Sequence, residues 1–243
     1  MGRPVSGGYN SYGQNVGIIM LDTKFPRLPG DIGNASTWRY PVMYRTVKGA
    51  VTSRIMGHEP DRELIGPFID AARELEAAGA KIITTSCGFL APFQRILADE
   101  VSVTVATSSL LQVPLVARMI GPRRKVGILT ERARFMSDVH FEAVGFTSRT
   151  VSVAVGGLRE GSEFADTFIG GRLELDYDAL ERDMIEGTER LVRENPEVGA
   201  IVFECTNMVP FSKAVQEAVG LPVFDIVTLV DWCFMASEST SEL

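Results

Sequence analysis

The sequence predicts an α/β fold of two pseudo-symmetric lobes, each a parallel sheet flanked by helices, with a cleft between them. Short apolar runs of strand length alternate with amphipathic segments along the whole chain. Residues 16–21 and 125–130 are two similar runs, Val-Gly-Ile-Ile-Met-Leu and Lys-Val-Gly-Ile-Leu-Thr. A third pattern occurs twice, because an apolar run ends at Cys87 and another at Cys205, each with Pro-Phe five and six positions later. These observations indicate an internal duplication.

The first lobe is predicted to span residues 16–120, with residues 222–236 returning to it. Its first strand, 16–21, is continuously apolar, as expected of a parallel strand covered on both faces. The Pro/Gly-rich segment 24–41 follows, and its length is typical of a lid or binding loop, although a simple surface excursion is an alternative. The other predicted elements are strands at 42–47, 81–86 and 101–105, an amphipathic helix at 61–78, a helix from the cysteine to about 98, and a helix at 108–119.

The second lobe is predicted to span residues 121–221. A Gly-rich connection at 156–171 separates its first half from a long charged helix that ends before Asn195-Pro196. Residues 1–15 and 237–243 are predicted to be flexible tails. The other predicted elements are strands at 125–130, 150–155, 200–204 and 222–224, and helices at 131–143, 176–193, between the second cysteine and 219, and up to 236.

Composition excludes several classes of protein. The 243 residues are 45% hydrophobic and 23% charged, with a net charge of -7 and no basic run, so nucleic acid and anionic membranes are not expected partners. The apolar runs are shorter than the ~20 residues that cross a bilayer, and the N-terminus lacks the apolar core of a signal peptide. Three cysteines, none in a CxxC motif, favour a reducing cytoplasm. A homodimer is an ordinary expectation for such a chain.

Two cysteines and one aspartate follow predicted strands, where parallel sheets bind their ligands. They are Asp22, Cys87 and Cys205. A single cysteine at the end of an apolar strand is often only a small buried hydrophobic residue. Burial alone, however, does not explain why cysteine recurs at one offset from Pro-Phe. If the lobes face each other, the two thiols flank one cleft.

Paired thiols suggest proton transfer at carbon. A thiolate has a pKa of about 8.5, and the N-terminus of the helix that follows each cysteine is expected to lower it. One cysteine can then remove a proton from carbon while the other returns a proton to the opposite face. This chemistry needs no metal or other cofactor, and His58 and His140 lack the spacing of metal ligands. Cys233, beside two aromatic residues of the last helix, is interpreted as a structural thiol.

The duplicated lobes, with Ser86-Cys87-Gly88 and Glu204-Cys205-Thr206, resemble the aspartate/glutamate/hydantoin racemase superfamily, which includes arylmalonate decarboxylase and maleate isomerase. The resemblance extends from residue 16 to about 236. The segment from Cys205 to Pro210 is similar to the Cys-Thr-His-x-Pro block of glutamate racemases, with Asn207 at the histidine and one extra residue before the proline. Asp22 resembles the aspartate of their Asp-Ser-Gly block.

The first motif departs from that pattern. Many amino-acid racemases have Asn-Thr after the first cysteine, and that pair binds the substrate carboxylate, whereas this chain has Gly88-Phe89. Backbone amides there can still hold an oxyanion, and Phe89 makes the pocket more apolar. The Thr-Ser-Cys-Gly-Phe-Leu and Leu-Asp-Thr-Lys-Phe-Pro-Arg blocks are more similar to a branch related to the algal dimethylsulfoniopropionate lyases.

The first hypothesis is therefore a cofactor-independent racemase or epimerase of a small carboxylate substrate, an isomerase with Cys87 and Cys205 as opposed acid and base. Thr206 and the amides after each cysteine are expected to bind the carboxylate. Asp22 is expected to orient a thiol, and Arg27 to bind a distal acid. Thr85, Ser86 and Asn207 are further candidates for the pocket.

Two alternatives stay open at this stage. The same site can serve a lyase or decarboxylase, of the dimethylsulfoniopropionate lyase or arylmalonate decarboxylase type, in which one cysteine acts as base or proton donor. The other alternative is a binding protein with inert thiols in its cleft. Depressed thiol pKa values would speed alkylation and contradict this last reading.

Overall fold

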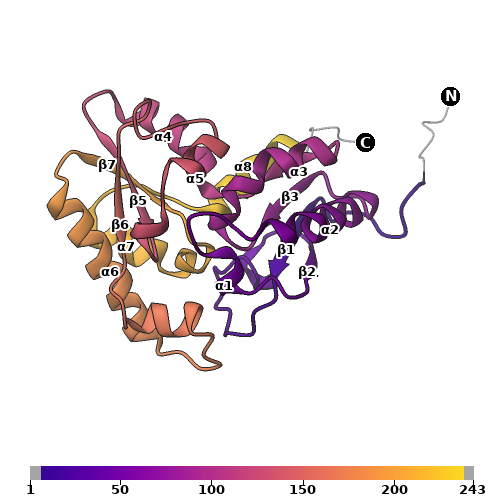
Figure 1. Cartoon of the computed structure of the whole chain (residues 1–243), viewed down its shortest axis with the longest axis horizontal. Coiled ribbons are helices and arrows are strands. Elements are labelled where there is room, and N and C mark those ends of the chain that lie inside the picture. Colours follow the sequence, from indigo (N-terminus) through magenta and orange to yellow (C-terminus); the bar gives the residue numbers. More distant parts are fainter. Residues whose placement is uncertain (1–6, 238–243) are drawn as a thin grey trace.

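The computed structural model describes residues 7–237 and contains two parallel four-stranded sheets (Figure 1). Of the predicted flexible tails, residues 1–6 and 238–243 lie outside the described part. The first sheet has the order β2-β1-β3-β4 and the second β6-β5-β7-β8, so each sheet repeats one topology. The predicted α/β fold of two similar lobes is confirmed. The strands are β1 (Val16–Leu21), β2 (Val42–Val47), β3 (Ile82–Thr85), β4 (Thr104–Ala106), β5 (Lys125–Thr130), β6 (Val153–Gly157), β7 (Val198–Phe203) and β8 (Val223–Phe224).

The helices follow the predicted alternation with local differences. The short α1 was not predicted, and the predicted helix 131–143 is a 3-10 turn, Ala133–Phe135, followed by α5. The Gly-rich segment 156–171 contains the π-helix Ala165–Ile169. The helices are α1 (Thr52–Ile55), α2 (Ile65–Ala77), α3 (Gln94–Glu100), α4 (Val113–Ile120), α5 (Asp138–Ala143), α6 (Tyr177–Glu194), α7 (Ser212–Val219) and α8 (Ile226–Ser237).

The chain changes sheets at other places than the predicted lobe boundaries. Helix α4, predicted in the first lobe, contacts β5 and β7 of the second sheet. Strand β8, also predicted in the first lobe, pairs with β7. Only afterwards does α8 return to contact β3 and β4, and Figure 1 shows this yellow helix among the first-lobe elements. Residues 222–224 therefore belong to the second sheet.

The sheets are held together by a shared core. Residues of β1, β3, β5 and β7 are almost all buried, which accounts for their continuous apolar sequences. One hydrophobic cluster includes Ile19 and Ile83 of the first sheet together with Val126 and Val202 of the second. This packing fixes the strand ends of the two sheets relative to each other. Within residues 7–237, no helix combines the length and apolarity needed to span a membrane.

Candidate active site

Both cysteine motifs have the same local structure. Cys87 follows β3 and caps the 3-10 helix Gly88–Phe93, and Cys205 follows β7 and caps the 3-10 helix Thr206–Phe211. Each 3-10 helix contains a proline at its fifth position, and because proline has no N–H to donate, it does not support an α-helical bond there. The repeated offset from cysteine to Pro-Phe thus corresponds to a repeated turn that places a cysteine at a strand end.

The residues flanking the two cysteines contact each other crosswise. Thr206 Oγ1 donates a 2.9 Å hydrogen bond to the backbone oxygen of Ser86. On the other side, Gly88 lies against Glu204 so closely that a Cβ on this glycine would be 2.2 Å from the Glu204 backbone oxygen. The residue after each cysteine therefore contacts the residue before the other. This arrangement brings the two thiols to one junction between the sheets, where Cys87 contributes to raising the pKa of Cys205.

Burial, rather than the following helix, dominates the titration of both thiols. Desolvation and the nearby Glu204 raise the pKa of Cys87 to about 12, against the opposing effects of the Phe89 N–H and of Arg27. Desolvation, Glu204 and Cys87 raise the pKa of Cys205 well above its ordinary value, against the N–H of Asn207. The predicted lowering by a helix N-terminus was wrong in net direction, because one N–H in a short 3-10 helix is weaker than the cost of desolvating a thiolate.

Glu204 is an acidic residue of the site that sequence reasoning missed as a functional candidate. It is 1% exposed, and its Oε2 is 2.7 Å from the hydroxyl of Thr130. Its other carboxyl oxygen, Oε1, is buried without a hydrogen-bond partner among the described residues. Burial raises the pKa of Glu204 to about 8. The available signal was a glutamate directly after a fully apolar strand, a position where ionised side chains are rarely left without a partner.

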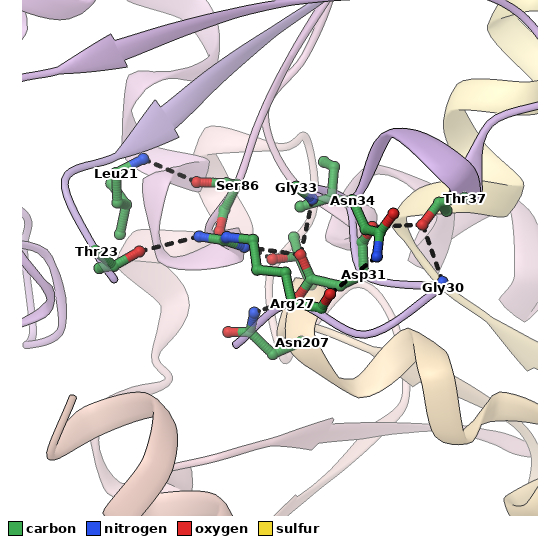
Figure 2. Close-up of polar contacts among 12 residues, drawn as sticks. Leu21, Thr23, Arg27, Gly30, Asp31, Gly33, Asn34, Thr37, Ser86 and Asn207 are labelled. Carbon is green, nitrogen blue, oxygen red and sulfur yellow. Dashed lines mark hydrogen bonds and ion pairs between the residues drawn. The ribbon is translucent and has the colours of Figure 1, made fainter. Parts of the chain in front are cut away.

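The loop 24–41 reaches across to the second cysteine motif. Asp31 of this loop is 2% exposed and accepts a 2.6 Å hydrogen bond from Asn207 Nδ2 (Figure 2). Its other oxygen accepts from Arg27 and from the Gly33 N–H, both at 2.7 Å. Gly30 packs against Pro210, where a Cβ would be 2.9 Å from the proline Cα. The loop is therefore an ordered part of the site, and Asp31 is its second missed residue.

Arg27 does not present a free cation to the site. Its guanidinium pairs with Asp31 at 2.7 Å and donates to Thr23 Oγ1 at 3.0 Å, as Figure 2 shows. It also lies 4.7 Å from the centre of the Phe25 ring. Because its charge is neutralised by a buried carboxylate, it is poorly placed to bind a distal substrate acid.

The other predicted residues differ in their contacts with the two cysteine motifs. Ser86, Gly88, Thr206 and Asn207 come together around the cysteines through the contacts described above. Asp22 is directed elsewhere, because its carboxylate accepts from the Gly49 N–H at 3.1 Å and pairs with Lys24 at 3.7 Å.

Three predicted residues beside the cysteines make contacts that stabilise the fold. Thr85 Oγ1 donates to the backbone oxygen of Thr107 at 2.7 Å, and Ser86 Oγ accepts from the Leu21 N–H at 2.9 Å. Phe89 is 1% exposed and packs edge-on against His140, with 5.1 Å between ring centres. Among residues 7–237, no group of three or more His, Cys, Asp or Glu side chains is arranged to hold a metal ion.

Several solved structures share this fold. Unliganded arylmalonate decarboxylase is 15% identical, with a TM-score of 0.58 over 94% of each chain. The glutamate racemase of Francisella tularensis, solved with D-glutamate, is 15% identical, with a TM-score of 0.55 over 95% of this chain and 85% of that one. An aspartate racemase homologue from Pyrococcus horikoshii is 19% identical, with a TM-score of 0.56 over 93% and 100%. The chain thus has the fold of the aspartate/glutamate racemase superfamily.

The sequence relatives of this chain are dimethylsulfoniopropionate lyases. A dimethylsulfoniopropionate lyase from Durusdinium sp. clade D is 28% identical over 90% of this chain and 73% of its own length. Dimethylsulfoniopropionate lyases 7 and 3 of Emiliania huxleyi are 30% and 29% identical over 88% of this chain, which spans 64% and 57% of their lengths. No family model matches the chain. The resemblance predicted from the two cysteine motifs is confirmed, and these relatives agree with the suspected branch.

Proposed function

We propose that this chain is a cofactor-independent lyase that eliminates a neutral sulfide from a sulfonium-bearing carboxylate, as in cleavage of dimethylsulfoniopropionate to acrylate and dimethyl sulfide. The names of its sequence relatives support this reaction over the racemisation that the cysteine pair first suggested. A lyase was the alternative drawn from sequence, and it now has the stronger support.

The observation that carries the proposal is the charge of the site. Arg27 is neutralised by Asp31, while the buried acid Glu204 raises the pKa of both thiols. A substrate with a second carboxylate would approach the acidic Glu204 and would find Arg27 already paired with Asp31. A substrate with a sulfonium group brings its own positive charge, which favours the thiolate form of a neighbouring cysteine. The site therefore suits a cationic leaving group better than a dicarboxylate.

Elimination needs one base and a leaving group. A cysteine thiolate takes the proton from Cα, and the C–H electron pair forms the double bond between Cα and Cβ. The Cβ–S bond breaks with its pair moving to sulfur, so the sulfonium leaves as neutral dimethyl sulfide and the thiol holds the proton. The first N–H groups of a helix lack partners within it, so those of Gly88 and Thr206 are candidates to bind the substrate carboxylate.

Racemisation is the second candidate, and one observation favours it. The crosswise contacts of Ser86 with Thr206 and of Gly88 with Glu204 bring one thiol from each lobe to the same junction. Two opposed acids and bases are what inversion of a stereocentre requires, whereas elimination needs only one.

A single experiment separates the two. The purified protein is incubated in D2O with dimethylsulfoniopropionate, with each enantiomer of aspartate and glutamate, and with an arylmalonate, and products are followed by proton NMR. Acrylate and dimethyl sulfide from the sulfonium substrate alone are the expected result. Deuterium at Cα with the opposite enantiomer would instead establish a racemase, and a monoacid from the malonate a decarboxylase. The double variant Cys87→Ser/Cys205→Ser is the control for reaction without enzyme.

A further inference from the structure

The side chain of Asn207 joins Cys205 to the loop 24–41. Cys205 Sγ lies 3.6 Å from Asn207 Oδ1, and the amide nitrogen of the same side chain donates to Asp31 Oδ2 at 2.6 Å. These contacts link Cys205, Asn207 and Asp31 in series. They are buried, since Asp31 and Asn207 are 2% and 7% exposed. Asp31 is itself fixed by Arg27 and by the Gly33 N–H.

The hydrogen bond between Asn207 and Asp31 determines which amide atom of Asn207 faces Cys205. An ionised carboxylate only accepts hydrogen bonds, so the amide group facing Asp31 is the NH2 end. The amide oxygen is therefore turned toward Cys205. A carbonyl oxygen also only accepts, so its favourable partner is an S–H group, and a thiolate at that place would face the negative end of the amide dipole.

The first motif has no such partner. Phe89 stands two residues after Cys87, where Asn207 stands after Cys205, and its ring packs on His140. The Phe89 side chain offers no acceptor to the Cys87 thiol. Arg27, although paired with Asp31, opposes in part the rise of the Cys87 pKa. The surroundings of both cysteines favour the thiol, and only those of Cys205 add an acceptor for its S–H group.

We propose that Asp31 and Asn207 hold Cys205 as a protonated thiol, which leaves Cys87 as the base. The inference rests on the proposed function, since it assigns roles to the same two thiols. Cys87 removes the Cα proton, and Cys205 remains neutral, so a second negative charge does not build up beside the first. Its S–H can turn from Asn207 toward the substrate carboxylate as charge develops there. Asp31 and Asn207 are positioning residues, because they act through Cys205.

The test measures each thiol separately in the full chain without substrate. Iodoacetamide labelling is followed from pH 6 to 10, and the rate at each cysteine is read by mass spectrometry of its peptide. In the unmodified protein, Cys87 is expected to be labelled at least ten times faster than Cys205 at each pH, which corresponds to a tenfold difference in thiolate. Equal rates, or faster labelling of Cys205, would overturn the proposal without any variant.

Two variants localise the effect. Asn207→Leu keeps the volume and the net charge but removes the acceptor, so labelling of Cys205 at pH 8 should rise about three- to tenfold while that of Cys87 changes little. Asp31→Asn frees the amide to turn and should act in the same direction. Asp70→Asn, at an exposed carboxylate of α2, controls for loss of one negative charge. Equal changes at both cysteines in Asn207→Leu would contradict the proposal.

This outcome is separate from that of the NMR experiment. The order of the two labelling rates does not depend on which substrate the protein accepts. If no sulfonium compound reacts but Cys205 is labelled more slowly than Cys87, the lyase proposal fails and the assignment of the thiols stands. If acrylate forms but the order is reversed, the lyase stands and the positioning role of Asp31 and Asn207 fails.

Discussion

The two cysteine motifs share a backbone and differ in their neighbours. In the first, Phe89 follows the cysteine by two residues and is backed by His140, with no polar contact to the thiol from its side chain. In the second, Asn207 occupies that position and connects the thiol to Asp31. The residue before each cysteine also differs, because Ser86 Oγ accepts from a backbone N–H while one carboxyl oxygen of Glu204 has no partner within residues 7–237. The two thiols therefore occupy equivalent positions in the fold but have different neighbours.

Removing the thiols one at a time is the strongest test of the difference between the two motifs, and we expect the largest effects here. If Cys87 is the base, Cys87→Ser should lower kcat/KM for the sulfonium substrate by about 10³-fold, because an alcohol is a far weaker base than a thiolate. Cys205→Ser should cost roughly ten- to a hundredfold, since a hydroxyl can still donate a hydrogen bond. Steady-state acrylate formation measures both. Cys233→Ser, at a half-buried thiol in α8, is the matched control. Equal losses at the two sites would indicate that both cysteines transfer protons.

Substituting Glu204 sharpens the comparison, because its charge acts on both thiols. Desolvation raises the pKa of Glu204 from 4.5 to about 8, so ionising it costs stability that is absent below pH 4.5 and grows as the pH rises to 8. Glu204→Gln removes this cost and the charge. We expect a more stable protein above pH 8 and a rise of activity with pH that begins about one unit lower.

Thermal unfolding at pH 5 and pH 8.5 and a pH profile of kcat/KM check these two effects. Glu131→Gln, at a neighbouring buried acid paired with Arg132 at 3.1 Å, is the comparison variant and should shift the profile less. A profile for Glu204→Gln that coincides with that of the unsubstituted protein would show that Glu204 does not control the thiols.

The smallest expected effect concerns the apolar backing of the first motif. His140 is fully buried with both ring nitrogens unpartnered among the described residues, and burial lowers its pKa from 6.5 to about 4. The unfolded chain therefore binds a proton that the folded one does not, and stability is lost as the pH falls from 6.5 toward 4. His140→Leu should remove this loss, worth about 2 kcal/mol at pH 5. Denaturant unfolding at pH 5 and 7.5 measures it, and an equal change at both pH values would exclude titration of this histidine.

The sequence predicted the parts of the site that belong to repeated elements. Continuous apolar runs identified the buried strands, and the repeated offset from cysteine to Pro-Phe identified Cys87 and Cys205 as equivalent positions. Asp31 and Glu204 were not identified, because their importance depends on how loop 24–41 and the end of β7 meet residues distant in sequence. The predicted binding of a distal acid by Arg27 did not take into account its ion pair with Asp31, because this aspartate lies in a loop without periodicity. No local sequence pattern indicated that α4 packs on the second sheet rather than on the first.

The close approach of Gly88 to Glu204 restricts how this chain could have evolved. Any side chain at residue 88 would meet both the backbone oxygen of Glu204 and its carboxyl group, with a Cβ only 2.2 Å from the former. Replacing Glu204 by a smaller residue would remove the carboxyl but not the backbone oxygen. An asparagine at residue 88, as in the Asn-Thr pair of amino-acid racemases, therefore cannot be introduced by substitution alone, because the end of β7 would also have to move. The two motifs are epistatic, and a mutational path between the two kinds of active site must change both lobes together.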